Sequence, residues 1–503
     1  MTNHLFSEIR NRMPDEGKTF LETAEGRRLT YGDVVSLSAR FAQALIGLGV
    51  EPGDRVAVQV EKSPEALMLY LATVRAGGVF LPLNTAYTPA EIDYFVTDAE
   101  PKVLVCDPAS REALSATASK VGASLQTMDA AGRGSLTDLA EAQDGAFEDV
   151  ARADDDLAAI LYTSGTTGRS KGAMLSHENL ASNARTLVDY WKFTSDDVLL
   201  HALPIFHTHG LFVATNCLLM AGGSLLFLPK FDLDTVLKLL PRATTMMGVP
   251  TFYIRLLTSS AFTKDLVAHM RLFISGSAPL SAEVHREFSG RTGHAILERY
   301  GMTETNMNTS NPYDGERRPG TVGFPLPGVA VRIADPQTGR EVARGEVGVI
   351  EVKGPNVFQG YWRMPEKTAE EFRVDRFFIT GDMGQVSEDG YISIVGRAKD
   401  LIISGGFNVY PAEVEALIDE IEGVAESAVV GVPHPDFGEG VVAVVAPKAG
   451  VTLDPAAITG ALADKLAKFK QPKKVHVLET LPRNTMGKIQ KNVLRDQFKG
   501  DFA

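Results

Sequence analysis

A glycine-rich loop directly after a buried strand is the feature that most constrains the fold of this chain. The apolar run 157–161 predicts the strand, and the loop extends from Tyr162 to Gly172 with the sequence YTSGTTGRSKG. Glycines let backbone N–H groups approach a polyphosphate, hydroxyls donate hydrogen bonds to its oxygens, and Lys171 supplies positive charge. Because a helical pattern follows the loop, we expect a strand–loop–helix unit that binds a nucleotide.

The spacing of this loop differs from that of the common mononucleotide-binding loop, in which Lys directly follows Gly and precedes Ser or Thr. Here Lys171 comes three residues after Gly168 and is followed by Gly172. A surface turn rich in Gly, Ser and Thr is the structural alternative. The position after a strand favours a nucleotide site, but it does not tell what happens to the nucleotide.

Composition and charge exclude several classes of protein. At about 150 residues per domain, 503 residues predict two to four folded units. A net charge of −13 argues against nucleic acid as a partner, because an acidic surface repels phosphates. Two distant cysteines, Cys106 and Cys217, form no disulfide framework and indicate a reducing compartment. The sequence has neither an apolar signal core nor a long apolar stretch, so we expect a cytoplasmic protein that does not span a membrane.

Alternating helical and strand patterns between residue 30 and about residue 235 predict parallel sheets covered by helices. Thr30 is a candidate N-cap of the first of these helices. Glycine, proline and short β-rich segments from about 320 to 396 predict a β-rich subdomain. From residue 397 the alternation returns. We therefore expect an α/β fold with a large N-terminal domain of parallel or mixed sheets, residues 1–396, and a small α+β domain, residues 397–503.

Five further segments carry side chains suited to chemistry. Their sequences are PIFH at 204–207, YGMTET at 300–305, TGD at 380–382, GRAKDLIISGGFNVYPAEVE at 396–415 and PRNTMGKI at 482–489. Together with the loop, and in this order, they resemble the acyl-adenylate-forming superfamily. This superfamily contains acyl-CoA synthetases, adenylation domains of peptide synthetases and luciferases. The resemblance covers essentially the whole chain, and six motifs in series are not coincidental.

The resemblance implies a two-step reaction on small-molecule substrates. A carboxylate attacks the α-phosphate of ATP to give acyl-AMP and pyrophosphate, and the thiol of coenzyme A then displaces AMP. A carboxylate is a poor nucleophile towards a polyanion, so the first step requires charge neutralisation and alignment. The family implies Mg²⁺ for part of this neutralisation.

The resemblance also implies roles for individual residues. Thr163, Ser164, Gly165, Thr166, Thr167, Gly168 and Lys171 would hold the phosphates. Glu304 would bind Mg²⁺ with Thr167, since a carboxylate is a hard oxygen donor for a hard cation. Tyr300 would stack on adenine beside Gly301 and Met302, and Asp382 would accept the ribose hydroxyls with help from Arg397. The catalytic set would be Lys488, Glu304, His207 and Thr303.

In the family the small domain is mobile, and the hinge position corresponds to Lys399. Lys488 would serve the first step, and rotation would then withdraw it and bring Ser404, Gly405 and Gly406 towards coenzyme A. Exposure during this rotation suggests that a lysine acetyltransferase and a deacetylase act on Lys488.

The histidines at 207 and 209 are not expected to form a metal site, because no further ligands cluster with them in the sequence. The family implies that His207 gates the acyl pocket. No role for His209 follows from the sequence.

Arg299 stands where many acyl-CoA synthetases carry glycine or alanine. A buried guanidinium facing a fatty tail is costly, whereas one facing a second carboxylate forms charge-assisted hydrogen bonds. Arg255 and Ser277 are candidates for the same acid site. This set resembles malonyl-CoA synthetases. The structural alternatives are that Arg299 pairs with Glu298 and that Arg255 lies on a solvated helix face.

We therefore expect a malonate:CoA ligase that makes malonyl-CoA, AMP and pyrophosphate, with methylmalonate as a further substrate. A synthetase for another short-chain or aryl acid is the nearest alternative, because one methyl group changes binding by only about 1–3 kcal/mol. An adenylation enzyme that loads a carrier protein is the second, and a non-catalytic nucleotide-binding protein is the third.

Overall fold

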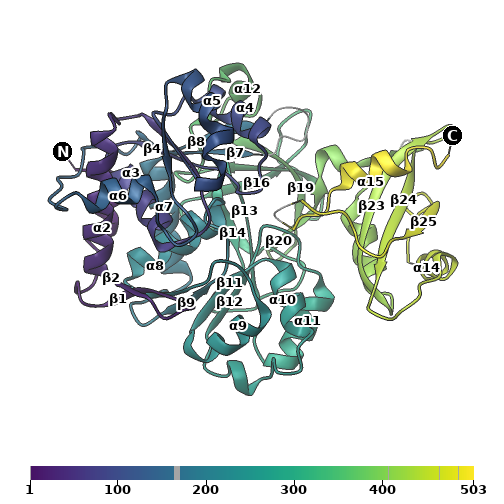
Figure 1. Cartoon of the computed structure of the whole chain (residues 1–503). Coiled ribbons are helices and arrows are strands. Elements are labelled where there is room, and N and C mark those ends of the chain that lie inside the picture. Colours follow the sequence, from purple (N-terminus) through teal and green to yellow (C-terminus); the bar gives the residue numbers. More distant parts are fainter. Residues whose placement is uncertain (1, 164–169, 406, 464, 485–486, 503) are drawn as a thin grey trace.

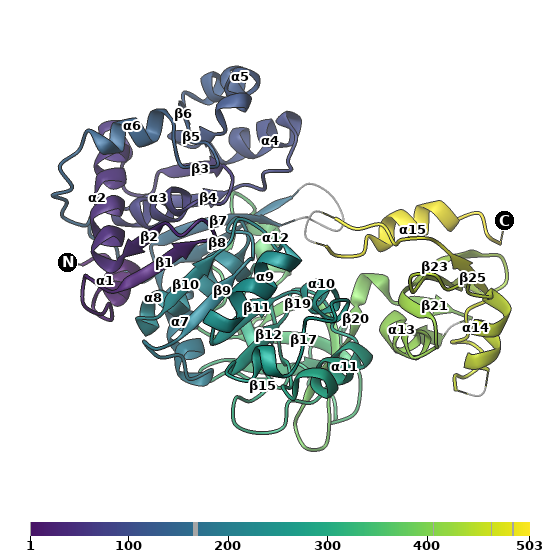
Figure 2. The same ribbon diagram turned by 60° about the horizontal axis from the view of Figure 1, so that its bottom comes forward.

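A computed structural model of the chain describes residues 2–163, 170–405, 407–463, 465–484 and 487–502. Figures 1 and 2 show a larger part that contains the N-terminus and a smaller part formed by the C-terminal strands and helices. The two parts are connected through the segment that follows β20 (Ile392–Arg397).

The first sheet of the larger part is mostly parallel. Its strands, in spatial order, are β18 (Gly360–Tyr361), β8 (Lys171–Ser176), β7 (Leu157–Thr163), β4 (Val79–Pro82), β3 (Arg55–Gln59), β5 (Val103–Cys106) and β6 (Ser124–Thr127). The pairs β18–β8 and β8–β7 are antiparallel, and the remaining pairs are parallel. The glycine-rich loop therefore connects two neighbouring antiparallel strands, β7 and β8.

The second sheet contributes the strands on which most of the site is built. Their spatial order is β15 (Phe324–Pro325), β14 (Asn306–Ser310), β13 (Leu297–Met302), β12 (Leu272–Ser275), β11 (Thr245–Gly248), β9 (Val198–His201), β10 (Ser224–Phe227), β1 (Thr19–Thr23) and β2 (Arg28–Thr30). The run from β13 to β1 is parallel.

The remaining strands form two further sheets, which are mainly antiparallel. The β subdomain has the order β16 (Ala330–Ala334), β17 (Gly348–Lys353), β19 (Phe378–Val386) and β20. The C-terminal sheet has the order β22 (Phe407–Val409), β21 (Ile402–Ser404), β24 (Gly438–Pro447) and β23 (Val424–His434), with β25 (Lys474–Val477) parallel to β24.

The helices cover the sheets, and α3 (Pro64–Arg75) lies between them. Every residue of α3 is buried, including Glu65 and Arg75, and its apolar side chains share one cluster with residues of β3 and β9. The other helices are α1 (His4–Arg10), α2 (Tyr31–Gly47), α4 (Pro89–Ala99), α5 (Arg111–Val121), α6 (Ser135–Glu141), α7 (His177–Tyr190), α8 (Asn216–Ala221), α9 (Leu233–Leu239), α10 (Pro250–Leu257), α11 (Ala282–Thr292), α12 (Pro365–Glu370), α13 (Pro411–Asp419), α14 (Pro455–Leu462) and α15 (Lys491–Phe498).

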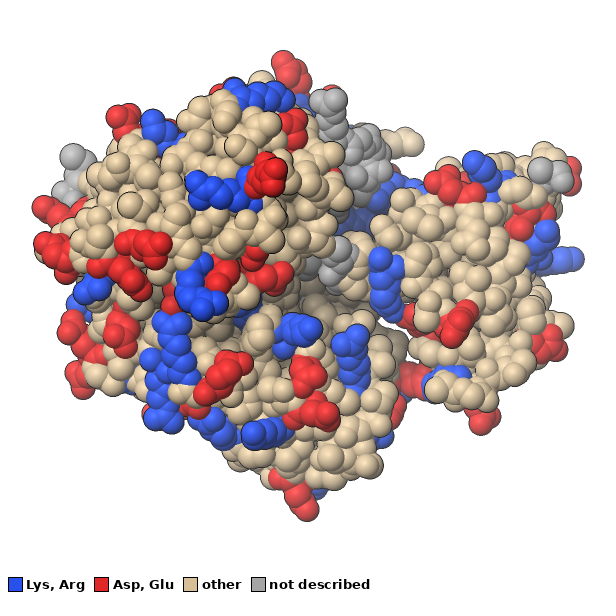
Figure 3. Space-filling view, in the orientation of Figure 1, with Lys and Arg blue, Asp and Glu red and all other residues tan. Residues whose placement is uncertain are grey.

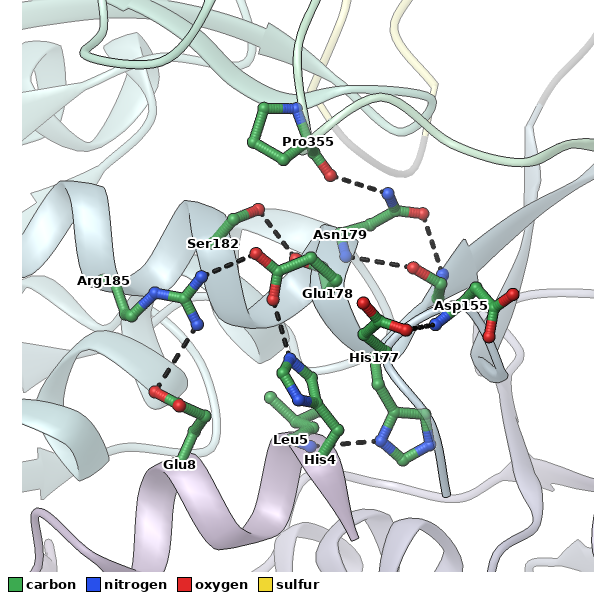
Figure 4. Close-up of polar contacts among 12 residues, drawn as sticks. His4, Leu5, Glu8, Asp155, His177, Glu178, Asn179, Ser182, Arg185 and Pro355 are labelled. Carbon is green, nitrogen blue, oxygen red and sulfur yellow. Dashed lines mark hydrogen bonds and ion pairs between the residues drawn. The ribbon is translucent and has the colours of Figure 1, made fainter. Parts of the chain in front are cut away.

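Polar contacts hold the N-terminal helix α1 against α7 (Figure 4). Glu178 accepts hydrogen bonds from His4 at 2.7 Å and from Arg185 at 2.6 Å. The backbone N–H of Leu5 donates to Nδ1 of the buried His177 at 3.2 Å. The contacts of His4 and Leu5 join residues more than 170 positions apart and hold α1 on the helix that follows β8.

The α/β fold class with a β-rich subdomain and a smaller C-terminal group is confirmed. Thr30 caps α2 and forms a capping box with Asp33. The strand–loop–helix prediction is wrong, because strand β8 comes between the loop and α7. The reason is local: residues 171–176 satisfy their backbone groups by pairing antiparallel with β7 before the helix begins at His177.

The molecular surface carries charged side chains of both signs. On the face drawn in Figure 3, basic and acidic side chains are interspersed over the surface. Within the described residues, no helix is long and apolar enough to cross a membrane. Both Cys106 and Cys217 are buried free thiols.

Candidate active site

The centre of the site lies where β12 ends beside its parallel neighbour β13, which continues to Met302. They pair up to Ser275 and Glu298, so the chain that leaves β12 at Gly276 lies against Arg299. A Cβ atom at Gly276 would lie 2.4 Å from Cζ of Arg299. Glycine at this position therefore makes room for the guanidinium.

Arg299 is a buried charge for which the described residues provide no counter-ion. Its side chain is 4% exposed, and within the described residues Nε and Nη2 have no hydrogen-bond partner. Burial lowers the pKa of Arg299 to about 9, so the group stays charged at neutral pH. Burial raises the pKa of Glu298 to about 8, and neighbouring residues of a strand point to opposite faces. An ion pair between Arg299 and Glu298 is absent from the described contacts.

Several neutral polar groups surround this guanidinium. His209 is buried, and its Nδ1 lies 3.3 Å from Oγ of Ser277, whose φ of +70° is unusual for a residue with a side chain. Nε2 of His209 and Oγ of Ser275 are buried and have no partner among the described residues. Arg299, whose charge acts on His209, and this imidazole leave hydrogen-bonding capacity unused in one place, whereas Ser275 pairs in register with Glu298 and so faces the other side of the sheet from Arg299. Such a set is expected where a ligand, rather than the protein, provides the partner.

The histidines at 207 and 209 are uncharged. Burial lowers the pKa of His207 to about 3, with further lowering by the positive charges of Lys488 and Arg299. Burial also holds the pKa of His209 well below its usual value, and Arg299 and His207 add to this effect. A π-helical turn, His209–Thr215, begins at this point. Such turns are frequent at functional sites.

A second cluster links the end of the glycine-rich loop to Glu304. The ammonium of Lys171 pairs with Glu371 at 2.9 Å and lies over the ring of Tyr361 at 4.0 Å. The hydroxyl of Tyr361 lies 2.8 Å from a carboxylate oxygen of Glu371 and 3.1 Å from one of Glu304. Burial raises the pKa of Glu304. The cluster thus places one buried carboxylate beside a lysine that can neutralise phosphate.

A third group joins β13 to the β subdomain. The hydroxyl of the buried Tyr300 donates to Asp382 at 2.5 Å, and Nε of Arg397 pairs with the same carboxylate at 2.7 Å. Register places Asp382 of β19 opposite Arg397 of β20. These contacts orient Asp382, which as a paired carboxylate can still accept further hydrogen bonds.

Lys488 reaches this site from the C-terminal part of the chain. Its side chain is partly exposed to solvent, but its ammonium is enclosed by protein, and burial lowers its pKa. The charges that act on it are those of Arg397, Asp382, Glu304 and Arg299. The chain thus brings residues from positions 171 to 488 into one place.

Other predicted residues lie at the edges of this arrangement. Oγ1 of Thr163, at the end of β7, donates to the carbonyl of Lys171 at 3.4 Å. Gly301 and Met302 continue β13, and Thr303 directly precedes Glu304. A Cβ atom at Gly301 would lie 1.9 Å from the carbonyl oxygen of Asn306, so the turn requires glycine. Five predicted phosphate contacts lie outside the described residues: Ser164, Gly165, Thr166, Thr167 and Gly168.

The structure does not bring every predicted residue to this centre. Arg255 is exposed on α10 and packs over the ring of Phe231 at 5.9 Å, and no described contact joins it to Arg299. Lys399 lies in an exposed turn after β20. Ser404 and Gly405 lie at the end of β21, where the N–H of Gly405 donates to the carbonyl of Phe437. Gly406 is outside the described residues.

Sequence reasoning missed Tyr361, Glu371 and Ser275, and it left His209 without a role. Tyr361 and Glu371 are more than 180 residues from Lys171 in the chain, so no local pattern connects them. Ser275 is the last residue of an apolar strand, and its isolation as a buried hydroxyl on β12 was a signal that could have been used.

The residues that could hold Mg²⁺ can be assessed from the donor set. Within the described residues, no group of three or more His, Cys, Asp or Glu side chains could hold a metal ion. Glu304 alone therefore fits a cation that takes its other ligands from nucleotide phosphates and water, as Mg²⁺ commonly does. The arrangement as a whole suits activation of an anionic substrate by a polyphosphate, because cations and carboxylates meet in a buried site.

Comparisons with known proteins agree with this geometry. Residues 8–362 match the AMP-binding enzyme family, and residues 413–488 match the AMP-binding enzyme C-terminal domain. A malonate–CoA ligase of Arabidopsis thaliana is 34% identical over 98% of this chain and 90% of the relative. A feruloyl-CoA synthase of an Amycolatopsis species is 37% identical over 94% of each.

Among solved structures, ATP-bound MatB from Rhodopseudomonas palustris is 63% identical, with a TM-score of 0.98 and full coverage of both chains. The apo form of the same relative gives a TM-score of 0.88. The two TM-scores do not differ because of sequence, since both structures are of the same relative. The chain belongs to the AMP-binding enzyme family.

The hydrogen bond between Tyr300 and Asp382 provides a test of the nucleotide site. A hydrogen bond to a charged group contributes about 1.5–3 kcal/mol, so Tyr300→Phe should weaken ATP binding about tenfold or more while retaining the aromatic ring. Tyr391→Phe is the matched control, because its hydroxyl donates to the carbonyl of Glu316 at 2.8 Å outside the site. Isothermal titration with ATP measures both. Equal affinities in the two variants would remove Asp382 from the nucleotide site.

Proposed function

We propose that this protein is an ATP-dependent malonate:CoA ligase that forms malonyl-CoA, AMP and pyrophosphate through malonyl-AMP, with methylmalonate as a further substrate. The observation that carries the choice of acid is the buried Arg299, whose Nε and Nη2 have no partner among the described residues. A second carboxylate supplies the missing charge and accepts both hydrogen bonds, whereas an aryl or alkyl tail would leave the guanidinium unpaired.

In the proposed first step, one carboxylate of the acid attacks the α-phosphorus of ATP, and the bond to pyrophosphate breaks. Arg299, with Ser277 and His209 beside it, holds the other carboxylate and so fixes the orientation of the acid. Because the imidazole of His207 is neutral, it forms no ion pair with the reacting carboxylate and does not hold it away from the nucleotide. The acid then has one orientation relative to the nucleotide.

The nucleotide would be held by three groups of residues. Tyr300 packs against adenine, Asp382 accepts the ribose hydroxyls, and Lys171 exchanges Glu371 for phosphate oxygens. Glu304 would hold Mg²⁺, which supplies charge neutralisation when it is bound. Lys488 stabilises the charge that develops between the α-phosphate and the attacking carboxylate.

In the proposed second step, the thiolate of coenzyme A attacks the acyl carbon, and AMP leaves. We propose that the chain divides at residues 396–397 and that rotation near Lys399 withdraws Lys488 and presents Ser404, Gly405 and Gly406 to coenzyme A. Among the described residues of the site, Lys488 is the one that follows the hinge residue Lys399 in the chain, and it would therefore leave with the C-terminal part.

The choice of acid is tested by pyrophosphate release with ATP, Mg²⁺ and coenzyme A across malonate, methylmalonate, succinate, acetate, octanoate and a cinnamate. We expect activity with malonate and methylmalonate. Arg299→Ala should lower kcat/KM for malonate by about 30-fold or more, since loss of one partner of a buried charge pair costs about 2 kcal/mol or more.

Arg255→Ala separates the two predicted arginines. Because Arg255 is exposed, we expect its variant to keep the malonate kcat/KM of the wild type. A preference of the wild type for a monoacid, unchanged in Arg299→Ala, would discard malonate and retain the ligase chemistry. Loss of activity in Arg255→Ala would place that residue in the acid site. Pyrophosphate release with none of the acids would favour the loading of a carrier protein.

Lys488→Ala tests the division of the two steps. We expect malonyl-AMP formation to fall by about 10²–10³-fold, as for loss of one transition-state donor, while thioester formation from supplied malonyl-AMP is retained. Lys491→Ala is the control, because Lys491 pairs with Glu415 at 2.6 Å within the C-terminal part. Rapid-quench measurement of each half-reaction decides, and equal losses in both half-reactions of Lys488→Ala would contradict the rotation.

We propose further that a lysine acetyltransferase and a deacetylase control this enzyme at Lys488 in the cytoplasm. The partial exposure of the Lys488 side chain supports access. Acetylation removes the positive charge on which the first step depends. Enzyme that is stoichiometrically acetylated at Lys488 should lose malonyl-AMP formation and recover it on deacetylation. Normal turnover of the acetylated enzyme, measured by pyrophosphate release, would refute this regulation.

A further inference from the structure

The segment from His201 to Gly210 carries both histidines of the acid site. It leaves the end of β9, passes through His207 and His209 and enters the π-helical turn. Segments of this kind are irregular, so their conformation depends on contacts from outside. The contacts that fix this one begin at Lys62, a residue far away in the sequence.

Lys62 is a buried lysine with every donor in use. It lies between β3 and α3 and is 8% exposed. Its ammonium donates to Nδ1 of His201 at 2.9 Å, to the carbonyl of His201 at 2.8 Å and to the carbonyl of Leu203 at 2.9 Å. The ring of Phe227 covers it at 4.2 Å. An ammonium that is held by neutral acceptors alone is costly to bury, so its retention calls for a reason beyond packing.

His201 links the contact with Lys62 to Gly210 at the other end of the segment. Because Nδ1 accepts a hydrogen bond from Lys62, the proton of the neutral imidazole is on Nε2, which donates to the carbonyl of Gly210 at 2.9 Å. Burial holds the pKa of His201 well below its usual value, in agreement with a neutral ring. One imidazole thus connects the beginning and the end of a ten-residue segment.

Two contacts tighten the segment between these ends. A Cβ atom at Gly210 would lie 2.0 Å from the carbonyl oxygen of Pro204, so the chain closes on itself without a gap. Oγ1 of Thr208 donates to Oδ1 of Asn306 at 2.8 Å, and Asn306 is two residues after Glu304. Thr208 stands between His207 and His209. A shift of the segment would therefore move both imidazoles relative to Arg299 and Glu304.

We infer that Lys62 and His201 are positioning residues for the acid site: they fix both ends of the segment that carries His207 and His209 without touching the substrate. The inference rests on the proposed acid site around Arg299 and extends it to residues behind it. Loosening the segment would misplace His209 beside Arg299, which would impair recognition of the second carboxylate. Asp382, Arg397 and Tyr300 are on other strands, so ATP binding would be retained.

Lys62→Met tests this inference, since methionine keeps the length of the side chain and removes the donors. We expect the KM for malonate to rise about tenfold or more, because small misplacements in a site have effects up to about 10²-fold. The ratio of kcat/KM for malonate to that for acetate should fall, and the KM for ATP should stay within twofold of the wild type.

Arg271→Met is the matched control for a purely structural effect. Arg271 forms a partly buried ion pair with Asp197 at 2.6 Å, and Asp197 directly precedes the start of β9, the end opposite to His201. This variant should lower the melting temperature and leave the KM for malonate unchanged. If Lys62→Met lowers the melting temperature and also leaves the malonate KM and the malonate-to-acetate ratio unchanged, the inference is wrong.

Substitutions at His201 keep the test decisive if Lys62→Met does not fold. Gln can accept from Lys62 and donate to Gly210, whereas Leu can do neither. We expect His201→Leu to raise the KM for malonate and His201→Gln to keep a KM closer to that of the wild type. Equal malonate KM values in the two variants would overturn the inference. Failure of the proposed function is distinguishable, because it would show as a wild-type preference for an acid other than malonate.

Discussion

The buried guanidinium of Arg299 is the interaction on which the organisation of the site depends. A charge in a protein interior must be paired or hydrogen-bonded, and here no protein anion is supplied by the described residues. Gly276 makes space for the guanidinium, Glu298 is kept neutral by burial, and both nearby histidines are uncharged. The surroundings therefore leave one positive charge that a substrate carboxylate can neutralise, and this explains why so many polar groups near it are unpaired.

The nucleotide side of the site follows a different principle. Its charges are already paired in the protein: Lys171 with Glu371, and Arg397 with Asp382. Paired groups stay ordered and can exchange or share a partner when phosphates or ribose hydroxyls arrive. On the acid-binding side the charge of Arg299 has no described partner, whereas on the nucleotide side Lys171 and Arg397 are already paired with carboxylates. Lys488 lies between the two and, among the described residues of the site, is the one that follows Lys399 in the chain.

Much of the fold was predictable because it depends on short-range patterns. The apolar run 157–161 predicted β7, and Thr30 predicted the start of α2. The same approach failed after the glycine-rich loop, where β8 precedes α7. Residues 171–176 carry no strong strand pattern of their own, and it is pairing with β7 that makes them a strand. Arg255 shows the same limit, because helical spacing alone did not show which face of α10 is exposed.

The sequence by itself determined the type of chemistry, because the glycine-rich loop, the carboxylates and the lysines that carry it occur in short motifs that can be recognised in order along the chain. It also singled out Arg299 as a charge in an unusual place. Only the tertiary structure decided that Nε and Nη2 of Arg299 have no partner among the described residues, that Tyr361 and Glu371 join Lys171 to Glu304, and that Lys62 anchors the segment of His207 and His209. The physical reason is that burial and hydrogen-bond satisfaction are properties of side chains brought together from distant strands, and no local pattern records them.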